Sequence, residues 1–230
     1  MQNLPTAETY AKEATYMPWG ILVREIIEYV VENVPQGGTV LDLLCGTGYL
    51  LGELQQKRPD ISFVGVDLES EFIEYAKKRY PGIGFVVGDA MTWGGDRTFD
   101  SVLCTGGLHH LSYEKQEEFI RKISQLVKPE GFAIVGDPYI DSYTNENERK
   151  AAATKLGNEY LAATMHNGAP DDVIKATASL IENDVLLVEF KDSLENVEPY
   201  FKKAFSSVEK HKTWPKADTQ YGDYYFVLRK

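Results

Sequence analysis

The stretch Val40-Leu41-Asp42-Leu43-Leu44-Cys45-Gly46-Thr47-Gly48 decides the fold of this chain. It has the pattern of a buried strand that ends in a glycine turn, and residues 49–57 then continue as a helix. Glycine suits such a turn because it adopts a positive φ and lets a ligand approach the backbone closely. Doubly wound α/β proteins bind nucleotide-like cofactors where such a strand meets a helix N-terminus.

Short apolar runs alternate with amphipathic segments from residue 39 onwards. This alternation predicts a mostly parallel sheet with helices on both faces, the doubly wound, Rossmann-like α/β class. The expected strands are 39–44, 62–66, 83–87, 99–104 and 132–135, with helices near 49–57, 70–79 and 113–127. Two further strands, 206–212 and 224–229, are expected to form an antiparallel C-terminal edge.

The 230 residues suit a single domain in which other segments flank the core of residues 39–137. Residues 1–38 are expected to form an N-terminal helical cover, with an amphipathic helix at 20–34. Residues 140–185 are expected to be a helical insertion of two helices, broken by Asn-Gly-Ala-Pro at 167–170, that covers the substrate. A last helix is predicted at 193–204, capped by Asp192.

Acidic residues follow the second and third expected strands. Asp67 comes about twenty residues after the glycine turn, where a carboxylate can accept hydrogen bonds from ribose hydroxyls. Asp89, in Gly88-Asp89-Ala90, supplies a second carboxylate. A dinucleotide site is disfavoured because Leu51 stands where its third glycine or alanine belongs. A nicotinamide-dependent oxidoreductase is therefore the weaker alternative, and no Tyr-x-x-x-Lys pair supports it.

With these motifs in this order, residues 39–137 resemble the class I S-adenosylmethionine-dependent methyltransferases. The resemblance implies that Asp42, Gly46 and Gly48 frame the methionine end of the cofactor, Asp67 the ribose, and Asp89 with Ala90 the adenine. The full set of implied cofactor-binding residues is Asp42, Cys45, Gly46, Thr47, Gly48, Asp67, Leu68, Asp89, Ala90, Cys104 and Thr105.

One residue departs from the family's pattern, because Leu44 stands where glycine is usual. A bulkier turn predicts either a slightly different cofactor position or a lower affinity. It also leaves open a cofactor-binding domain without catalysis. Asp42 and Asp67 have a structural alternative as well, since aspartate often caps local backbone amides or a helix N-terminus.

The segments after the fourth and fifth strands are expected to face the transferred methyl group. Methyl transfer is a direct displacement that needs a base only if the acceptor arrives protonated. His109 or His110 is the candidate base, with Asp137 next and Tyr16 as an aromatic to test. Either histidine has the alternative of bonding backbone near a helix that begins at about residue 112.

The composition narrows the class of partner. A net charge of -11 without a basic stripe argues against nucleic acid. Cys45 and Cys104 are expected to be small buried residues and not zinc ligands. We predict no metal, no membrane association, a cytoplasmic location and a monomer or homodimer. The expected partner is a small-molecule methyl acceptor, methylated on oxygen or nitrogen, and protein methylation is the alternative.

Overall fold

The structure, a computed structural model, describes residues 6–186 and 189–230. Within them, seven strands form one sheet in the order β3-β2-β1-β4-β5-β7-β6. Strands β1 to β5 are parallel, and β7 is antiparallel to both β5 and β6. The strands are β1 Thr39–Leu43, β2 Ser62–Asp67, β3 Gly84–Val87, β4 Phe99–Thr105, β5 Val127–Tyr139, β6 Ser207–Trp214 and β7 Gly222–Arg229. The predicted fold class, with its antiparallel edge, is confirmed.

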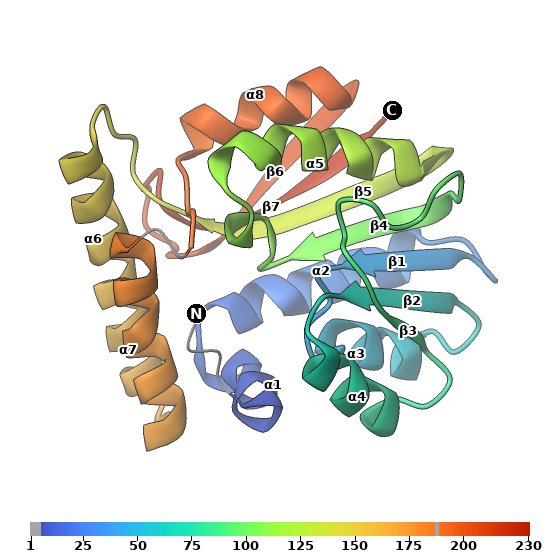
Figure 1. Cartoon of the computed structure of the whole chain (residues 1–230), viewed down its shortest axis with the longest axis horizontal. Coiled ribbons are helices and arrows are strands. Elements are labelled where there is room, and N and C mark those ends of the chain that lie inside the picture. Colours follow the sequence, from blue (N-terminus) through green and yellow to red (C-terminus); the bar gives the residue numbers. More distant parts are fainter. Residues whose placement is uncertain (1–5, 187–188) are drawn as a thin grey trace.

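Helices cover both faces of this sheet (Figure 1). On one face lie α2 Trp19–Asn33, α3 Tyr49–Lys57 and α4 Ser70–Arg79, and on the other α5 Tyr113–Leu126 and α8 Leu194–Ala204. Successive strand residues point to opposite faces, so Val40 joins the core under α2 while Leu41 joins the core under α5. Both are fully buried, which explains why β1 is a continuous apolar run.

Three helices stand beyond the carboxyl ends of the parallel strands, at the left of Figure 1. They are α1 Ala7–Tyr16, α6 Glu146–His166 and α7 Asp171–Val185. The helices α6 and α7 form the hairpin that the break at 167–170 predicted. Helix α1 packs on α7, where Thr9 Oγ1 donates to Asp172 at 3.3 Å and Lys12 Nζ lies 3.7 Å from the same carboxylate.

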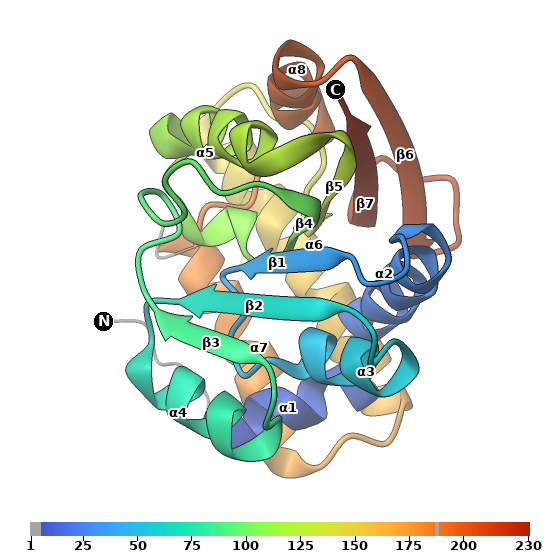
Figure 2. The ribbon, with the colours of Figure 1, turned by 90° about the vertical axis from the view of Figure 1, so that its right-hand side faces the viewer.

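The order of the strands places the cofactor turn at the centre of the sheet. Strand β1 lies between β2 and β4. The chain adds β2 and β3 on one side of β1, and then crosses over to add β4 and β5 on the other side. This reversal opens a crevice at the carboxyl ends of the strands, which is where such sheets bind ligands. Figure 2 shows the arrangement from a second side, with β3 at one edge and β6 at the other.

Three details differ from the sequence-based expectation. Strand β5 is much longer than 132–135, because it begins at Val127, which pairs with Phe99 of β4, and continues to Tyr139 through its pairing with β7. The predicted cap Asp192 is wrong: Ser193 caps α8 and accepts the Asn196 amide at 3.3 Å. Asp192 is engaged elsewhere, accepting from the Tyr143 hydroxyl at 2.8 Å. Helix α1 was not expected as a separate helix, and residues 1–5 of the predicted cover lie outside the described residues.

Among the described residues, none of the helices has both the length and the apolar character required to cross a bilayer.

The packing between α8 and the sheet predicts how much stability is lost when the ring of Phe226 is removed. Phe226 is fully buried, and its ring centroid lies 4.6 Å from that of Phe201. We expect Phe226→Ala to lower the free energy of unfolding in urea by about 3–5 kcal/mol, because the cavity adds to the lost burial. The control Phe226→Leu should cost clearly less. A loss below about 1 kcal/mol for the alanine variant would contradict this packing.

Candidate active site

The glycine turn after β1 is held to the end of β2 by one carboxylate. Gly46 has φ 53° and Gly48 has φ 73°, so both residues need the conformational freedom of glycine. The Gly46 amide donates to Asp67 Oδ2 at 2.8 Å, and the Glu69 amide donates to Asp67 Oδ1 at 2.9 Å. Asp67 therefore holds the turn in place, as well as standing where the ribose is expected.

Leu44, the departure from the family pattern, also takes the left-handed conformation, with φ 62°. This conformation costs a residue with a β-carbon about 1–2 kcal/mol. The side chain lies against Gly107, where an added β-carbon would be 2.9 Å from Leu44 Cβ. The absence of a side chain at residue 107 thus makes room for the one at residue 44.

A small cavity lies between the glycine turn and the N-terminal helices. Its volume is about 20 Å³, which is room for about one water molecule. The residues that line it are Tyr10, Trp19, Val23, Asp42, Leu44, Cys45, Thr47, Tyr49, Leu50 and Thr105. Tyr10 closes the cavity, because a β-carbon on Gly46 would lie 3.3 Å from its ring. A cavity of this size is too small for a nucleotide-like cofactor.

The polar groups of this cavity fit S-adenosylmethionine. Asp42 is 2% exposed and makes no hydrogen bond or ion pair with the described residues. Burial, followed by the charge of Asp67, raises the pKa of this carboxyl group well above its usual value. The buried hydroxyls of Thr47 and Thr105 also lack partners among the described residues. The methionine moiety carries an ammonium group and a carboxylate group on its α-carbon. These two groups would satisfy Asp42 and the two hydroxyls.

Of the other predicted cofactor residues, Cys45 lines this cavity, whereas Leu68, Asp89, Ala90 and Cys104 do not. Asp89 is exposed, and its Oδ1 accepts the Met91 amide at 2.8 Å, whereas Ala90 is buried. Leu68 is 58% exposed. Their adenine and ribose roles stay predictions. Cys45 and Cys104 are buried free thiols, as expected, and burial raises the pKa of both.

The candidate base His109 is held from two directions by Asp137. Its Nδ1 lies 3.0 Å from Asp137 Oδ1, and its backbone amide donates to Asp137 Oδ2 at 3.1 Å. His109 belongs to a short 3-10 turn, η1 Leu108–His110, directly after β4, and Asp137 lies near the end of β5. An ionised Asp137 keeps the proton on Nδ1 and leaves Nε2 as the proton acceptor. The structure thus places His109 and Asp137, two of the predicted catalytic residues, in direct contact.

The segment after α7 adds charged groups that the sequence analysis missed. Glu189 Oε2 lies 3.8 Å from His109 Nε2, and Lys191 Nζ binds the same oxygen at 2.5 Å. Lys191 also contacts Asp184 at 3.0 Å, and all three side chains are buried. The Phe190 amide donates to the His109 carbonyl at 2.6 Å, which fixes this segment beside η1. No motif marks Glu189 in the sequence.

The prediction of no metal is not tested by this arrangement. His109, His110 and Glu189 each offer a ligand atom within 4.8 Å of the others, which is a spacing that a cation could use. However, the Lys191 ammonium already binds the carboxylate oxygen that faces His109. The ring of His110 is tilted by 42° against that of His109, with ring centroids 4.3 Å apart, and burial lowers the pKa of His110.

Tyr16 lies away from the other predicted catalytic residues. It packs against the hydrophobic cluster beneath α6, which includes Met17 and Leu156, and its carbonyl accepts from Asn167 Nδ2 at 2.7 Å. Its predicted role gains no support from these contacts. Tyr10, which the sequence placed only in a flanking aromatic group, lines the cavity instead.

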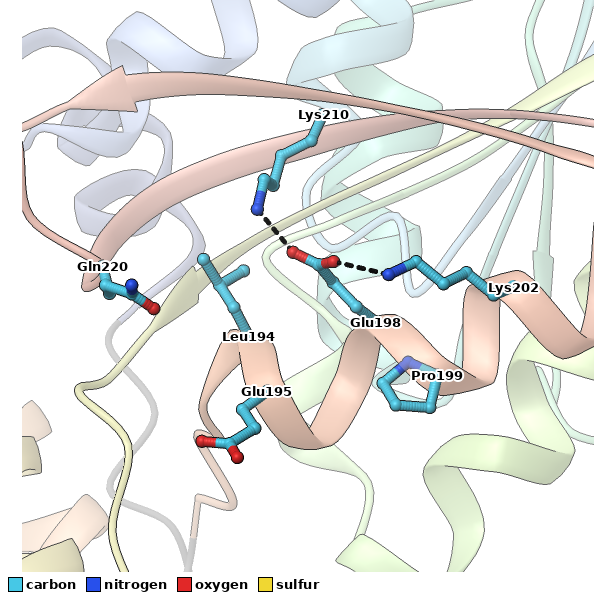
Figure 3. A pocket seen from close by; sticks show the side chains of 7 residues that line it. All are labelled: Leu194, Glu195, Glu198, Pro199, Lys202, Lys210 and Gln220. Carbon is cyan, nitrogen blue, oxygen red and sulfur yellow. Dashed lines mark hydrogen bonds and ion pairs between the residues drawn. The ribbon is translucent and has the colours of Figure 1, made fainter.

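A larger hollow of about 310 Å³ lies between α8 and β6, far from the glycine turn (Figures 1 and 3). Figure 3 shows that its central carboxylate, Glu198, is already paired with Lys202 and Lys210. The charge of this central carboxylate is therefore already neutralised by two lysines.

Comparison with known proteins, like the polar groups of the cavity, indicates a methyltransferase. Residues 40–131 match the family described as a methyltransferase domain. An uncharacterized methyltransferase of Oceanobacillus iheyensis is 28% identical over 168 residues, which is 73% of this chain and 76% of that protein. The chain also resembles a solved S-adenosylmethionine-dependent methyltransferase of Clostridium acetobutylicum, with TM-score 0.62, 16% identity and 92% of each chain covered.

A further solved structure has the cofactor bound. The magnesium protoporphyrin IX methyltransferase of Synechocystis, solved with S-adenosylmethionine, has TM-score 0.58 and 15% identity, covering 91% of this chain and 78% of that one. The fold and site define a methyltransferase of the Rossmann-like class. Residues 40–131 thus form a methyltransferase domain, and the matches support S-adenosylmethionine as its cofactor.

The contact between Leu44 and Gly107 predicts coupled mutational effects. We expect Gly107→Ala to lower the free energy of unfolding by about 1–3 kcal/mol, because the new methyl group overlaps Leu44. Leu44→Gly should cancel most of that loss when the two changes are combined. Urea unfolding of both single variants and the double variant measures the coupling. Additive effects would show that the two positions do not share this space.

Asp67 predicts a loss of cofactor affinity without a defect in the chemical step. Asp67→Ala removes both the ribose ligand expected here and the acceptor of the Gly46 amide. We expect the dissociation constant for S-adenosylmethionine to rise about 10- to 100-fold in calorimetry, since a charged hydrogen bond contributes about 1.5–3 kcal/mol. The control Glu69→Gln alters an exposed neighbour and should bind normally. Unchanged affinity in Asp67→Ala would remove Asp67 from the cofactor site.

Proposed function

We propose that this methyltransferase acts on a nitrogen or oxygen atom of a small metabolite, with His109 as the general base. The observation that carries the proposal is the buried His109–Asp137 pair at the carboxyl ends of β4 and β5. A base oriented by a second group is the arrangement that general-base catalysis uses.

Bound S-adenosylmethionine supplies a methyl carbon on a positively charged sulfur. Asp42, Thr47 and the glycine turn would hold its methionine end, and Asp67 its ribose. Asp137 fixes the ring of His109 and keeps the proton on Nδ1. His109 Nε2 then accepts the proton that the acceptor loses. Because a direct displacement needs aligned atoms and little water, the chain's main further task is positioning.

The covering helices support a small acceptor over a protein substrate. Helix α1 packs on α7 and closes the turn through Tyr10. The hairpin α6–α7 stands in front of the strand ends (Figure 1). We therefore keep residues 140–185 as the proposed substrate cover. Protein methylation would call for an open groove at this end of the sheet. The cytoplasmic location, the monomeric or homodimeric state and the absence of nucleic-acid binding stay predictions.

The proposed base predicts a split between turnover and cofactor binding. We expect His109→Ala to lower kcat about 10²- to 10⁴-fold with an accepted substrate, because the proton acceptor is lost. The affinity for S-adenosylmethionine should stay within about twofold, because His109 lies outside the cofactor cavity. Release of S-adenosylhomocysteine measures the first quantity, and calorimetry measures the second.

Two further variants sharpen this test. Asp137→Asn should also lower kcat, since the ring of His109 loses its orienting carboxylate. His110→Ala should leave a much larger part of the activity, because it keeps both hydrogen bonds between His109 and Asp137. Full activity in His109→Ala would exclude this residue as the base.

A further inference from the structure

Glu13 is a buried carboxyl group that has no partner within residues 6–186 and 189–230. It lies on α1 with 7% of its surface exposed, and it makes no hydrogen bond or ion pair with the described residues. Native proteins rarely bury a carboxyl group in this way, because the ionised form loses its water without compensation. Such a group requires a physical explanation, and a ligand that pairs with it is one.

The sequence pattern makes the position unusual as well. Tyr10, Glu13, Ala14 and Met17 follow the spacing of one helical face, and this face of α1 is turned inwards. A residue that serves only solubility would lie on the opposite face, as the exposed Glu8 does with Lys12 at 3.2 Å. Glu13 instead occupies a position where an apolar residue would stabilise the fold.

The charges around Glu13 favour a cation. Burial, and then the charge of Glu189, raises the pKa of Glu13 to about 8. The buried Lys191 ammonium is shared between Glu189 and Asp184, so it neutralises only part of the local negative charge. Tyr10, one turn before Glu13, lies within the electrostatic influence of Glu13, Glu189, Asp42 and Asp67. A cation that entered this region would meet an excess of carboxylates.

The position of Glu13 separates it from the cofactor. Asp42 lines the cofactor cavity and stands ready for the ammonium of the methionine moiety, whereas Glu13 is not among the lining residues. Tyr10, one helical turn before Glu13 on the same face, does line that cavity, so Glu13 lies close to the cofactor cavity without being part of its wall. The charge of Glu189, which lies 3.8 Å from His109 Nε2, also acts on Glu13.

We propose that Glu13 is the anionic anchor of the acceptor site, and that the acceptor is a small amine that arrives as an ammonium ion. This inference rests on the proposed function and narrows it from oxygen or nitrogen to nitrogen. Tyr10 and Glu13 lie one turn apart on the same face of α1, and a carboxylate and an aromatic ring provide the two kinds of contact, ionic and cation–π, that ammonium groups prefer.

The chemistry balances with the groups at hand. An ammonium ion has no lone pair, so it first gives one proton to His109 Nε2. The neutral nitrogen then forms a bond to the methyl carbon while the carbon–sulfur bond breaks, and that electron pair stays on sulfur. The product amine carries the positive charge that the sulfonium loses. Glu13 therefore faces a cation before and after the transfer.

The first experiment compares acceptors that differ in charge alone. The full-length protein with S-adenosylmethionine is assayed with a panel of small primary amines, each paired with the alcohol of the same carbon skeleton. S-Adenosylhomocysteine release reports transfer, and calorimetry in the presence of S-adenosylhomocysteine reports binding. We expect amines to bind and react, and their alcohol partners to do neither. Acceptance of the alcohols in preference to the amines, or no binding of any amine, would overturn the proposal.

The second experiment tests the residue. Glu13→Gln should raise KM for an accepted amine about 10- to 100-fold and leave the dissociation constant of S-adenosylmethionine unchanged. Glu13→Asp should recover part of the loss, and the control Glu8→Gln, an exposed change on the same helix, should behave as wild type. A normal KM in Glu13→Gln would show that Glu13 does not bind the acceptor. Equal losses of amine and cofactor affinity would assign Glu13 to the cofactor instead.

A third readout does not depend on turnover. Because ammonium binding ionises Glu13, it should release a proton near pH 7, which calorimetry detects as a dependence of the binding heat on the buffer. The release should vanish in Glu13→Gln but persist in His109→Ala. If His109→Ala keeps full activity while Glu13→Gln loses amine binding, His109 is not the general base, but Glu13 still binds the ammonium group of the acceptor. The same proton release in wild type and Glu13→Gln would contradict the anchor.

Discussion

The hydrogen bond from the Gly46 amide to Asp67 is the interaction on which the site depends. Strands β1 and β2 are paired in parallel, so their carboxyl ends meet, and this bond fixes the turn after one strand to the last residue of the next. The positive φ angles of Gly46 and Gly48 are tolerated because glycine has no β-carbon. A β-carbon on Gly48 would lie 2.5 Å from the ring of Phe85, so the packing below the turn requires glycine too.

From this turn, the placement of the other functional groups follows through the order of the strands. Asp42 projects from β1 into the cavity, His109 follows β4, and Asp137 lies at the end of β5. Parallel pairing brings these strand ends to one edge, so residues far apart in the chain become neighbours. This edge has many buried carboxylates and few cations. Its negative potential therefore attracts the positive charge of a sulfonium cofactor.

Much of this arrangement could be predicted from the sequence, because it depends on local patterns. Apolar runs predicted the strands, and the glycine turn with Asp67 predicted where the cofactor should bind, which stays a prediction. The carboxylate of Asp137 was named as a candidate beside His109, although their hydrogen bond needed the register of β4 and β5. The hairpin of α6 and α7 followed from the break at 167–170.

The rest could not be predicted, for physical reasons that differ from case to case. Glu189 reaches His109 only because the segment after α7 folds back beside η1, and no short-range pattern encodes that return. Asp192 resembled a helix cap, but Ser193 is the N-cap of α8, and Asp192 Oδ1 accepts from the Tyr143 hydroxyl as well as from the Ser193 amide and Asn196 Nδ2. Glu13 did leave a signal, a carboxylate on an otherwise apolar helix face, although the N-terminal helix itself was not recognised. Leu44 shows the reverse case, in which a residue that breaks the pattern is accommodated by a glycine distant in sequence.

The central claim is that the glycine turn, Asp42 and Asp67 form one S-adenosylmethionine site that α1 closes. A crystal structure of the protein with S-adenosylhomocysteine tests it most directly. The account predicts the ribose on Asp67, the methionine ammonium on Asp42, and the Tyr10 ring displaced from Gly46. A ligand bound elsewhere, or bound at the turn with Tyr10 still in contact with Gly46, would contradict it.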